Sequence, residues 1–264
     1  MAAARLRGRV KAAQFVEGAA RRVTADLLDL TLSPEPSAGL ATQLLHGEAF
    51  TVYEWRDDGL AWGQAERDGY VGYVRDEGLG PDRPAGRRVT AIGSHCYVAP
   101  SIKARVTGEL PFLAEPDVSG EEEGFATTSG GFVPLQHLAP LAGDAAAVAA
   151  RFEETPYLWG GRSARGLDCS ALVQMALLAT GTPAPRDSDM QAALLGAPLP
   201  DAASAKRGDL VFWRGHVGMM LDAETLIHAN AHHMAVTIEP LAPAVARIAG
   251  AGGGPVTARR RLGA

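Results

Sequence analysis

The stretch Gly166-Leu167-Asp168-Cys169-Ser170-Ala171-Leu172-Val173 opens a run that is apolar almost all the way round as far as Leu178. Gly181 and Pro183 follow this run. An apolar segment of helical length, with a polar residue before it and Gly and Pro after it, predicts a buried helix. Asp168 stands where a residue that caps the helix would lie.

A thiol stands at the start of this predicted helix. Cys169 would lie at the positive end of the helix dipole, which favours the thiolate and lowers the cysteine pKa. The other cysteine of the chain, Cys96, lies in a region of different character, so we expect no disulfide framework. A cysteine at a helix start is, taken alone, more often a small buried hydrophobic residue. The flanking sequence favours a nucleophile instead.

After the helix the pattern changes to short apolar runs separated by turn residues. Such runs predict consecutive strands in an antiparallel sheet that packs on the helix, and therefore an α+β fold. From Gly250 onward, five glycines and three consecutive arginines predict a loose end or a terminal strand, to which we assign no function. The predicted strands are 209–213, 217–221, 225–228 and 235–238.

Two histidines lie on these strands. His216 begins a strand after the turn at Arg214-Gly215, where its imidazole can face the helix start and act as a general base. His228 follows twelve residues later, an even offset across one hairpin, so it can face the same side and orient the ring of His216. One histidine on a strand is more often structural, but two of them after a capped cysteine favour catalysis.

A metal site is the alternative for these histidines. His-x3-His is a spacing that zinc uses on helices, although here it would fall on a strand and the following turn. We expect no metal or organic cofactor. The ligands of the alternative site would be His228, His232 and His233, together with Cys169 or His216.

The first half of the chain contains a repeat. Gly72-Tyr73-Val74 is followed by Leu79, and 59 residues later Gly131-Phe132-Val133 is followed by Leu138. β-rich runs at 49–53 and 89–92 precede the two copies. This spacing predicts two small β-barrels. A boundary is expected at 140–144, before an alanine-rich segment at 145–152 that favours a helix.

Composition limits the possible partners. The chain has 264 residues, 47% of them hydrophobic, which is enough for real cores. A net charge of -5 without a basic patch argues against nucleic acid. The N-terminus lacks an apolar segment of the length found in secretory signals, and no 18-residue apolar run occurs. We therefore expect a cytoplasmic protein without membrane partners.

The second half contains five short segments in order: Tyr157-Leu158-Trp159-Gly160-Gly161, 166–173, Gly208-Asp209-Leu210-Val211-Phe212, His216-Val217-Gly218 and Ile227-His228-Ala229. In order and spacing they closely resemble the NlpC-type papain-like cell-wall peptidases. The resemblance covers about residues 145–240. It implies that Cys169 is the nucleophile, His216 the base and His228 the third polar residue.

The two predicted barrels resemble the bacterial SH3-type domains of the γ-D-glutamyl-L-diamino acid endopeptidases, also called dipeptidyl-peptidase VI. In those enzymes an acidic residue and a tyrosine of the first barrel bind the free amine of an N-terminal L-Ala. The Asp and Ser that flank the catalytic cysteine contribute to the same site. The resemblance implies that the corresponding residues here are Glu54, Tyr70 or Tyr73, Asp168 and Ser170.

Two further features match the family pattern. Trp159 is a candidate for the pocket wall, and Arg186-Asp187-Ser188 follows the predicted helix. Each also has a structural interpretation, as a core aromatic and as a loop with a helix cap. Glu54 and the tyrosines could likewise be a surface charge and barrel-core aromatics, and Asp168 could be only a cap.

We expect an N-terminal segment at 1–30, SH3-like barrels at 31–83 and 84–140, and a peptidase domain at 145–264. The implied reaction is hydrolysis of the bond between γ-D-Glu and a diamino acid, meso-diaminopimelate, in L-Ala-γ-D-Glu-diaminopimelate, for recycling of cell-wall peptides. The alternatives are an amidase or acyltransferase, an endopeptidase on intact peptidoglycan, or a wall-binding module with an idle catalytic domain. The oligomeric state stays open.

Overall fold

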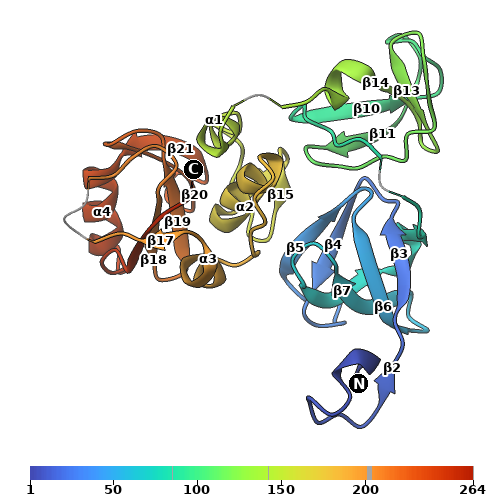
Figure 1. Cartoon of the computed structure of the whole chain (residues 1–264), viewed down its shortest axis with the longest axis horizontal. Coiled ribbons are helices and arrows are strands. Elements are labelled where there is room, and N and C mark those ends of the chain that lie inside the picture. Colours follow the sequence, from blue (N-terminus) through green and yellow to red (C-terminus); the bar gives the residue numbers. More distant parts are fainter. Residues whose placement is uncertain (85, 142, 201–203, 264) are drawn as a thin grey trace. The chain divides into compact units, whose positions relative to one another are not determined.

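The computed structural model describes residues 1–84, 86–141, 143–200 and 204–263. It divides the chain into two compact units, Met1–Ala139 and Pro140–Ala264 (Figure 1). The first unit is built from β-strands and short 3-10 helices, and the second combines helices with a sheet. Within the described residues, no helix has both the length and the apolar character required to cross a membrane.

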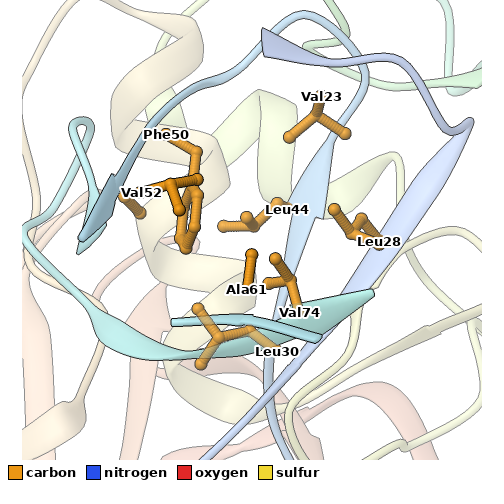
Figure 2. Close-up of a cluster of buried hydrophobic side chains, with 9 residues drawn as sticks. Val23, Leu28, Leu30, Leu44, Phe50, Val52, Ala61 and Val74 are labelled. Carbon is orange, nitrogen blue, oxygen red and sulfur yellow. The ribbon is translucent and has the colours of Figure 1, made fainter. Parts of the chain in front are cut away.

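The first unit contains a seven-stranded sheet in the order β5-β4-β8-β7-β6-β3-β9. It surrounds a core that includes Val23, Leu30 and Phe50 (Figure 2). The sheet takes in residues before 31, the expected start of the first barrel, because β3 pairs with β6 and β9. The strands are β3 (Ala19–Val23), β4 (Leu27–Thr31), β5 (Leu40–Leu45), β6 (Ala49–Trp55), β7 (Leu60–Ala65), β8 (Val71–Arg75) and β9 (Leu79–Pro81), preceded by β1 (Ala2–Ala3), η1 (Ala4–Leu6) and β2 (Phe15–Val16).

A five-stranded sheet of order β11-β10-β14-β13-β12 follows in the same unit. The sequence repeat marks the same local structure twice: Val74 and Val133 are buried in β8 and β14, and a 3-10 helix follows each strand. The elements are η2 (Asp76–Gly78), β10 (Gly93–Tyr97), β11 (Val106–Pro111), β12 (Gly120–Glu122), β13 (Phe125–Thr128), β14 (Gly131–Pro134) and η3 (Leu135–Leu138).

The strand predicted at 89–92 is wrong. Val89 is fully buried, but its N–H donates to the Ala114 carbonyl, and the Leu113 N–H donates to the Val89 carbonyl. The Thr90 N–H donates to the carbonyl of His137. Partners in the turn at Leu113 and Ala114 and in η3 therefore satisfy this segment, and the strand begins at Gly93 instead.

The second unit contains a six-stranded sheet of order β17-β22-β18-β19-β20-β21. The predicted helix and the four strands after it are confirmed, and β18 to β21 pair antiparallel in sequence order. The last strand, β22, pairs with β18, so the end of the chain is a terminal strand. The strands are β15 (Arg162–Ser163), β16 (Gly166–Leu167), β17 (Ala197–Pro198), β18 (Leu210–Trp213), β19 (His216–Met220), β20 (Thr225–Asn230), β21 (Ala235–Pro240) and β22 (Ala258–Arg261).

Four α-helices are described in this unit: α1 (Ala145–Ala150), α2 (Cys169–Ala179), α3 (Ser188–Leu194) and α4 (Leu241–Gly250). The helix favoured at 145–152 thus ends at Ala150. Helix α2 packs against β19 and β20. The sequence analysis did not predict α4, which packs through Ala244 on Trp213 and Leu226 of the sheet.

Candidate active site

Cys169 is the first residue of α2, and Asp168 caps that helix by accepting the Ala171 N–H at 2.8 Å. The sheet opens beside the thiol: β19 pairs with β18 from His216 onward, but with β20 at Met219 and Met220. In the stretch before Met219, the Val217 N–H donates to the Cys169 sulfur. The sulfur thus accepts a hydrogen bond that a carbonyl of a neighbouring strand would otherwise accept, at the residue next to His216.

Asp168 does more than cap the helix. Arg186 makes a two-pronged ion pair with it, at 3.0 Å to Oδ1 and 2.6 Å to Oδ2, and also donates to Ser170 Oγ at 2.9 Å. The Gly160 N–H and the Ser170 hydroxyl donate to the same carboxylate. All three side chains of this network are buried. Asp168 and Ser170, predicted as substrate groups, therefore also fix the start of α2.

The two predicted histidines meet. His216 Nε2 lies 2.8 Å from His228 Nδ1, and His228 Nε2 lies 2.7 Å from Glu239 Oε1. Arg247 of α4 forms an ion pair with the same carboxylate. Gly218 leaves room for this line, because a Cβ there would lie 3.2 Å from the His228 Cβ and 2.7 Å from Leu226.

Burial dominates the electrostatics of the site. Desolvation, followed by the charge of Asp168, raises the pKa of Cys169 to about 12, against the lowering effects of the Val217 N–H and Arg186. Desolvation also lowers the pKa of His216 to about 3 and lowers that of His228. The expected thiolate at neutral pH is therefore wrong for the resting structure, since desolvation outweighs the helix dipole. Both partners are neutral there.

Two aromatic residues precede the nucleophile in sequence, Tyr157 and Trp159. Trp159 is 67% exposed, on a turn that Gly160 closes with a φ of 76°. Tyr157 is half-buried, and burial followed by the charges of Cys169 and Asp168 raises its pKa to about 12. Tyr157 therefore lies close to the thiol, and the sequence analysis used it only as part of a motif.

The candidates in the first unit separate into two groups. Glu54 of β6 is opposite Trp62 of β7, and Trp62 is opposite Tyr73 of β8. Opposite residues in an antiparallel pair share a face, so Glu54 and Tyr73 lie on the same face of the barrel. Tyr70 instead packs against the barrel core.

The alternative metal site has no support in the described residues, where no group of three His, Cys, Asp or Glu side chains could hold a metal ion. Both ring nitrogens of His228 are engaged by His216 and Glu239. His233 contacts Asn230 Oδ1 at 3.0 Å, and its ring lies edge-on to that of His232.

Glu239 and Arg247 are the residues that sequence reasoning missed. Leu226 is opposite Glu239 and His228 is opposite Thr237, which places Glu239 two residues along β21 from the His228 partner. Glu239 directly follows the strand predicted at 235–238, and its even offset from Thr237 was the available signal. Arg247 had none, because α4 was not predicted.

Comparison with known proteins identifies both kinds of domain. Residues 30–79 match the family model of the bacterial dipeptidyl-peptidase SH3 domain, and residues 154–247 match that of the NlpC/P60 family. A dipeptidyl-peptidase 6 of Lysinibacillus sphaericus is 38% identical over 78 residues, which are 29% of this chain and 28% of that protein. This alignment thus spans less than a third of the relative.

Longer matches exist. A gamma-D-glutamyl-L-lysine dipeptidyl-peptidase of Bacillus cereus is 27% identical over 237 residues, 76% of this chain and 71% of that protein. The solved structure of an NlpC/P60 family protein from Bacillus cereus aligns with a TM-score of 0.73 at 18% identity, covering 92% of this chain and 99% of that one. The predicted resemblance and the α+β fold are confirmed, and the match to the NlpC/P60 family model lies within the second unit.

Proposed function

We propose that this chain, with its bacterial SH3 and NlpC/P60 domains, is a cysteine peptidase that hydrolyses the bond between γ-D-Glu and a diamino acid in cell-wall peptides with a free N-terminal L-Ala. The observation that carries the proposal is the placement of Cys169 at the start of α2, with its sulfur on the Val217 N–H. The hydrogen-bonded line of His216, His228 and Glu239 begins at the residue before Val217.

The neutral pair at the site suits acyl transfer. His216 takes the thiol proton of Cys169 as the sulfur attacks the carbonyl carbon of the scissile amide. The amide C–N bond then breaks, and the imidazolium returns the proton to the leaving amine. Water, deprotonated by the same imidazole, hydrolyses the thioester and releases the new carboxylate and the thiol. The step requires no cofactor.

We propose that residues of the first unit bind the amine end of the substrate. Glu54 and Tyr73 share a face with Trp62, which offers a carboxylate, a phenol and an aromatic surface to an ammonium group. The carboxylate of Asp168 already accepts from Arg186. An ammonium near Asp168 would share that carboxylate, so we propose that Glu54 accounts for most of the amine preference.

A free amine on alanine is a feature of peptides that have been released from the glycan. In intact wall the lactyl group of muramic acid occupies that nitrogen. We therefore propose a role in recycling such peptides. The relatives' names specify lysine as the diamino acid. The family resemblance also allows diaminopimelate, and both belong in the test.

The test is product analysis by mass spectrometry. L-Ala-γ-D-Glu-L-Lys, L-Ala-γ-D-Glu-diaminopimelate and their N-acetylated forms are incubated with the protein and with its Cys169→Ala variant. We expect release of L-Ala-γ-D-Glu from at least one free peptide by the wild type alone. Cleavage by the variant would contradict the proposal. Hydrolysis of simple acyl esters without cleavage of any peptide would favour the amidase or acyltransferase alternative.

A further inference from the structure

Four polar side chains form one line across four elements of the second unit. His216 comes from β19, His228 from β20, Glu239 from β21 and Arg247 from α4, and the three strands are consecutive in the sheet (Figure 1). His228 is fully buried, whereas the side chains of Glu239 and Arg247 are 16% and 24% exposed. The line therefore runs from the half-buried His216 through the fully buried His228 to the partly exposed Glu239 and Arg247.

The acceptor at the end of this line determines where the protons lie. A carboxylate accepts only, so His228 Nε2 must carry the hydrogen that it shares with Glu239 Oε1. In the neutral ring, His228 Nδ1 is then an acceptor, and it receives the hydrogen of His216 Nε2 at 2.8 Å. The remaining nitrogen, His216 Nδ1, is left with its lone pair.

We propose that Glu239 is a positioning residue that sets the tautomers of both histidines and leaves Nδ1 of His216 as the base that takes the thiol proton. Arg247 limits the stabilisation that Glu239 gives to the charged imidazolium. The inference rests on the proposed function only for the identity of the proton donor. Without the carboxylate, His228 can exchange its donor and acceptor nitrogens. In the exchanged tautomer it would face His216 with an N–H in place of a lone pair.

We call the line of His216, His228, Glu239 and Arg247 the relay. Arg247 adds to it a charge opposite in sign to that of Glu239. The charged and titratable groups that face the two rings are Glu239 on β21, Arg247 on α4 and His233 after β20. Glu239 stabilises the imidazolium that forms during proton transfer, whereas Arg247 opposes it. An ion pair with only a structural role would affect the histidines through packing alone. Removing either Glu239 or Arg247 would then shift the histidine pKa values in the same direction.

The first experiment observes the tautomers directly and needs no peptide. ¹⁵N-histidine NMR at neutral pH, assigned with His216→Gln and His228→Gln, should show both rings of the wild type protonated at Nε2. Glu239→Gln should keep this pattern, because the amide oxygen still accepts. Glu239→Leu should give mixed tautomers, and Glu224→Gln, at an exposed acid of the same unit, should match the wild type.

The second experiment compares the directions in which two substitutions shift the histidine pKa. In an NMR pH titration, Glu239→Gln should lower the apparent pKa of the histidine pair and Arg247→Met should raise it. Iodoacetamide labelling of Cys169 near neutral pH should slow in Glu239→Leu by about ten- to a hundredfold, part of the roughly 10²- to 10⁴-fold that general acid–base catalysis contributes. Glu239→Gln should recover most of that loss. Melting curves identify any variant that fails to fold.

Three outcomes would overturn the inference: Nδ1 protonation of His228 in the wild type, unchanged tautomers in Glu239→Leu, or shifts of the same sign in Glu239→Gln and Arg247→Met. Failure of the proposed function is separate. If no peptide is cleaved but the tautomers and labelling rates respond as stated, the relay stands and the substrate assignment falls. If Glu239→Leu cleaves peptide at the wild-type rate, the relay falls and the peptidase stands.

Discussion

Asp168 and Arg186 form a buried ion pair that ties the start of α2 to the loop before α3. Both carboxylate oxygens are engaged, one by each guanidinium nitrogen of the pair. Ser170 bonds to both partners. The residue before the nucleophile and the residue after it are therefore held by one side chain from a distant loop, which defines the position of the Cys169 backbone.

Removal of this arginine should be costly. Arg186→Met leaves a buried carboxylate without its cation, and breaking such a pair from one side costs about 3–5 kcal/mol. Arg207→Met is the matched control, because its pair with Asp144 is exposed and such pairs contribute about 0–1 kcal/mol. Urea denaturation measures both free energies of unfolding. Equal losses would mean that burial of the Asp168 pair has no energetic consequence.

The two cysteines should differ in function and not in acidity. Burial raises the pKa of Cys96 to about 11 and that of Cys169 to about 12, so neither is a free thiolate at neutral pH. Cys169→Ala should abolish peptide hydrolysis with an unchanged melting temperature, and Cys96→Ser should keep the activity. Only Cys169 labelling by iodoacetamide should depend on His216. Equal labelling of Cys169 in wild type and His216→Ala would remove His216 as the base.

The two histidines should differ in the severity of their loss. A base that transfers the proton matters more than a residue that orients it. His216→Ala should be nearly inactive, His228→Ala should retain more rate, and His228→Gln should be milder still because an amide can accept the His216 hydrogen bond. Steady-state kinetics ranks the three. A chelator should change nothing, and activity that EDTA removes and zinc restores would favour a metal enzyme.

Stability should fall on acidification because desolvation keeps the half-buried His216 neutral in the folded state. Its pKa is about 3 in the folded state against 6.5 for the ordinary side chain, so the unfolded chain binds the proton first. The stabilisation is complete above about pH 6.5 and is lost progressively as the pH falls towards 3. Between about pH 6 and 5, the wild type should lose about 1 kcal/mol more than His216→Gln. Parallel urea curves for the two proteins would contradict the burial.

The first unit should determine the preference for a free amine. If Glu54 and Tyr73 hold the ammonium, acetylation of the peptide should slow cleavage by about a hundredfold or more. Glu54→Gln should reduce the ratio of the cleavage rates of free and acetylated peptide, because it slows cleavage of the free peptide. Tyr73→Phe should do the same, whereas Tyr70→Phe, in the barrel core, should alter stability more than the ratio. Equal rates on acetylated and free peptides would leave Glu54 a surface charge and favour an endopeptidase on intact wall.

Local chemistry was sufficient to predict much of the second unit. The cap at Asp168 and the apolar run after it predict α2, and the Cys–His–His spacing predicts which residues are chemically reactive. These features depend on neighbours within a few residues or across one hairpin. The segment at 89–92 shows the limit of such reasoning, since Val89 is β-forming and buried but finds its hydrogen bonds in loops.

The sequence by itself determined the helix that presents Cys169, the strands of the two histidines and the family resemblance, because periodicity, capping and motif spacing are local properties. Only the tertiary structure decided that Glu239 and Arg247 complete the histidine line, that Tyr73 and not Tyr70 shares a face with Glu54, and that burial overrides the helix dipole at the thiol. Each of these depends on strand register, on packing between distant segments or on desolvation, and none of the three can be read from residues that are adjacent in the chain.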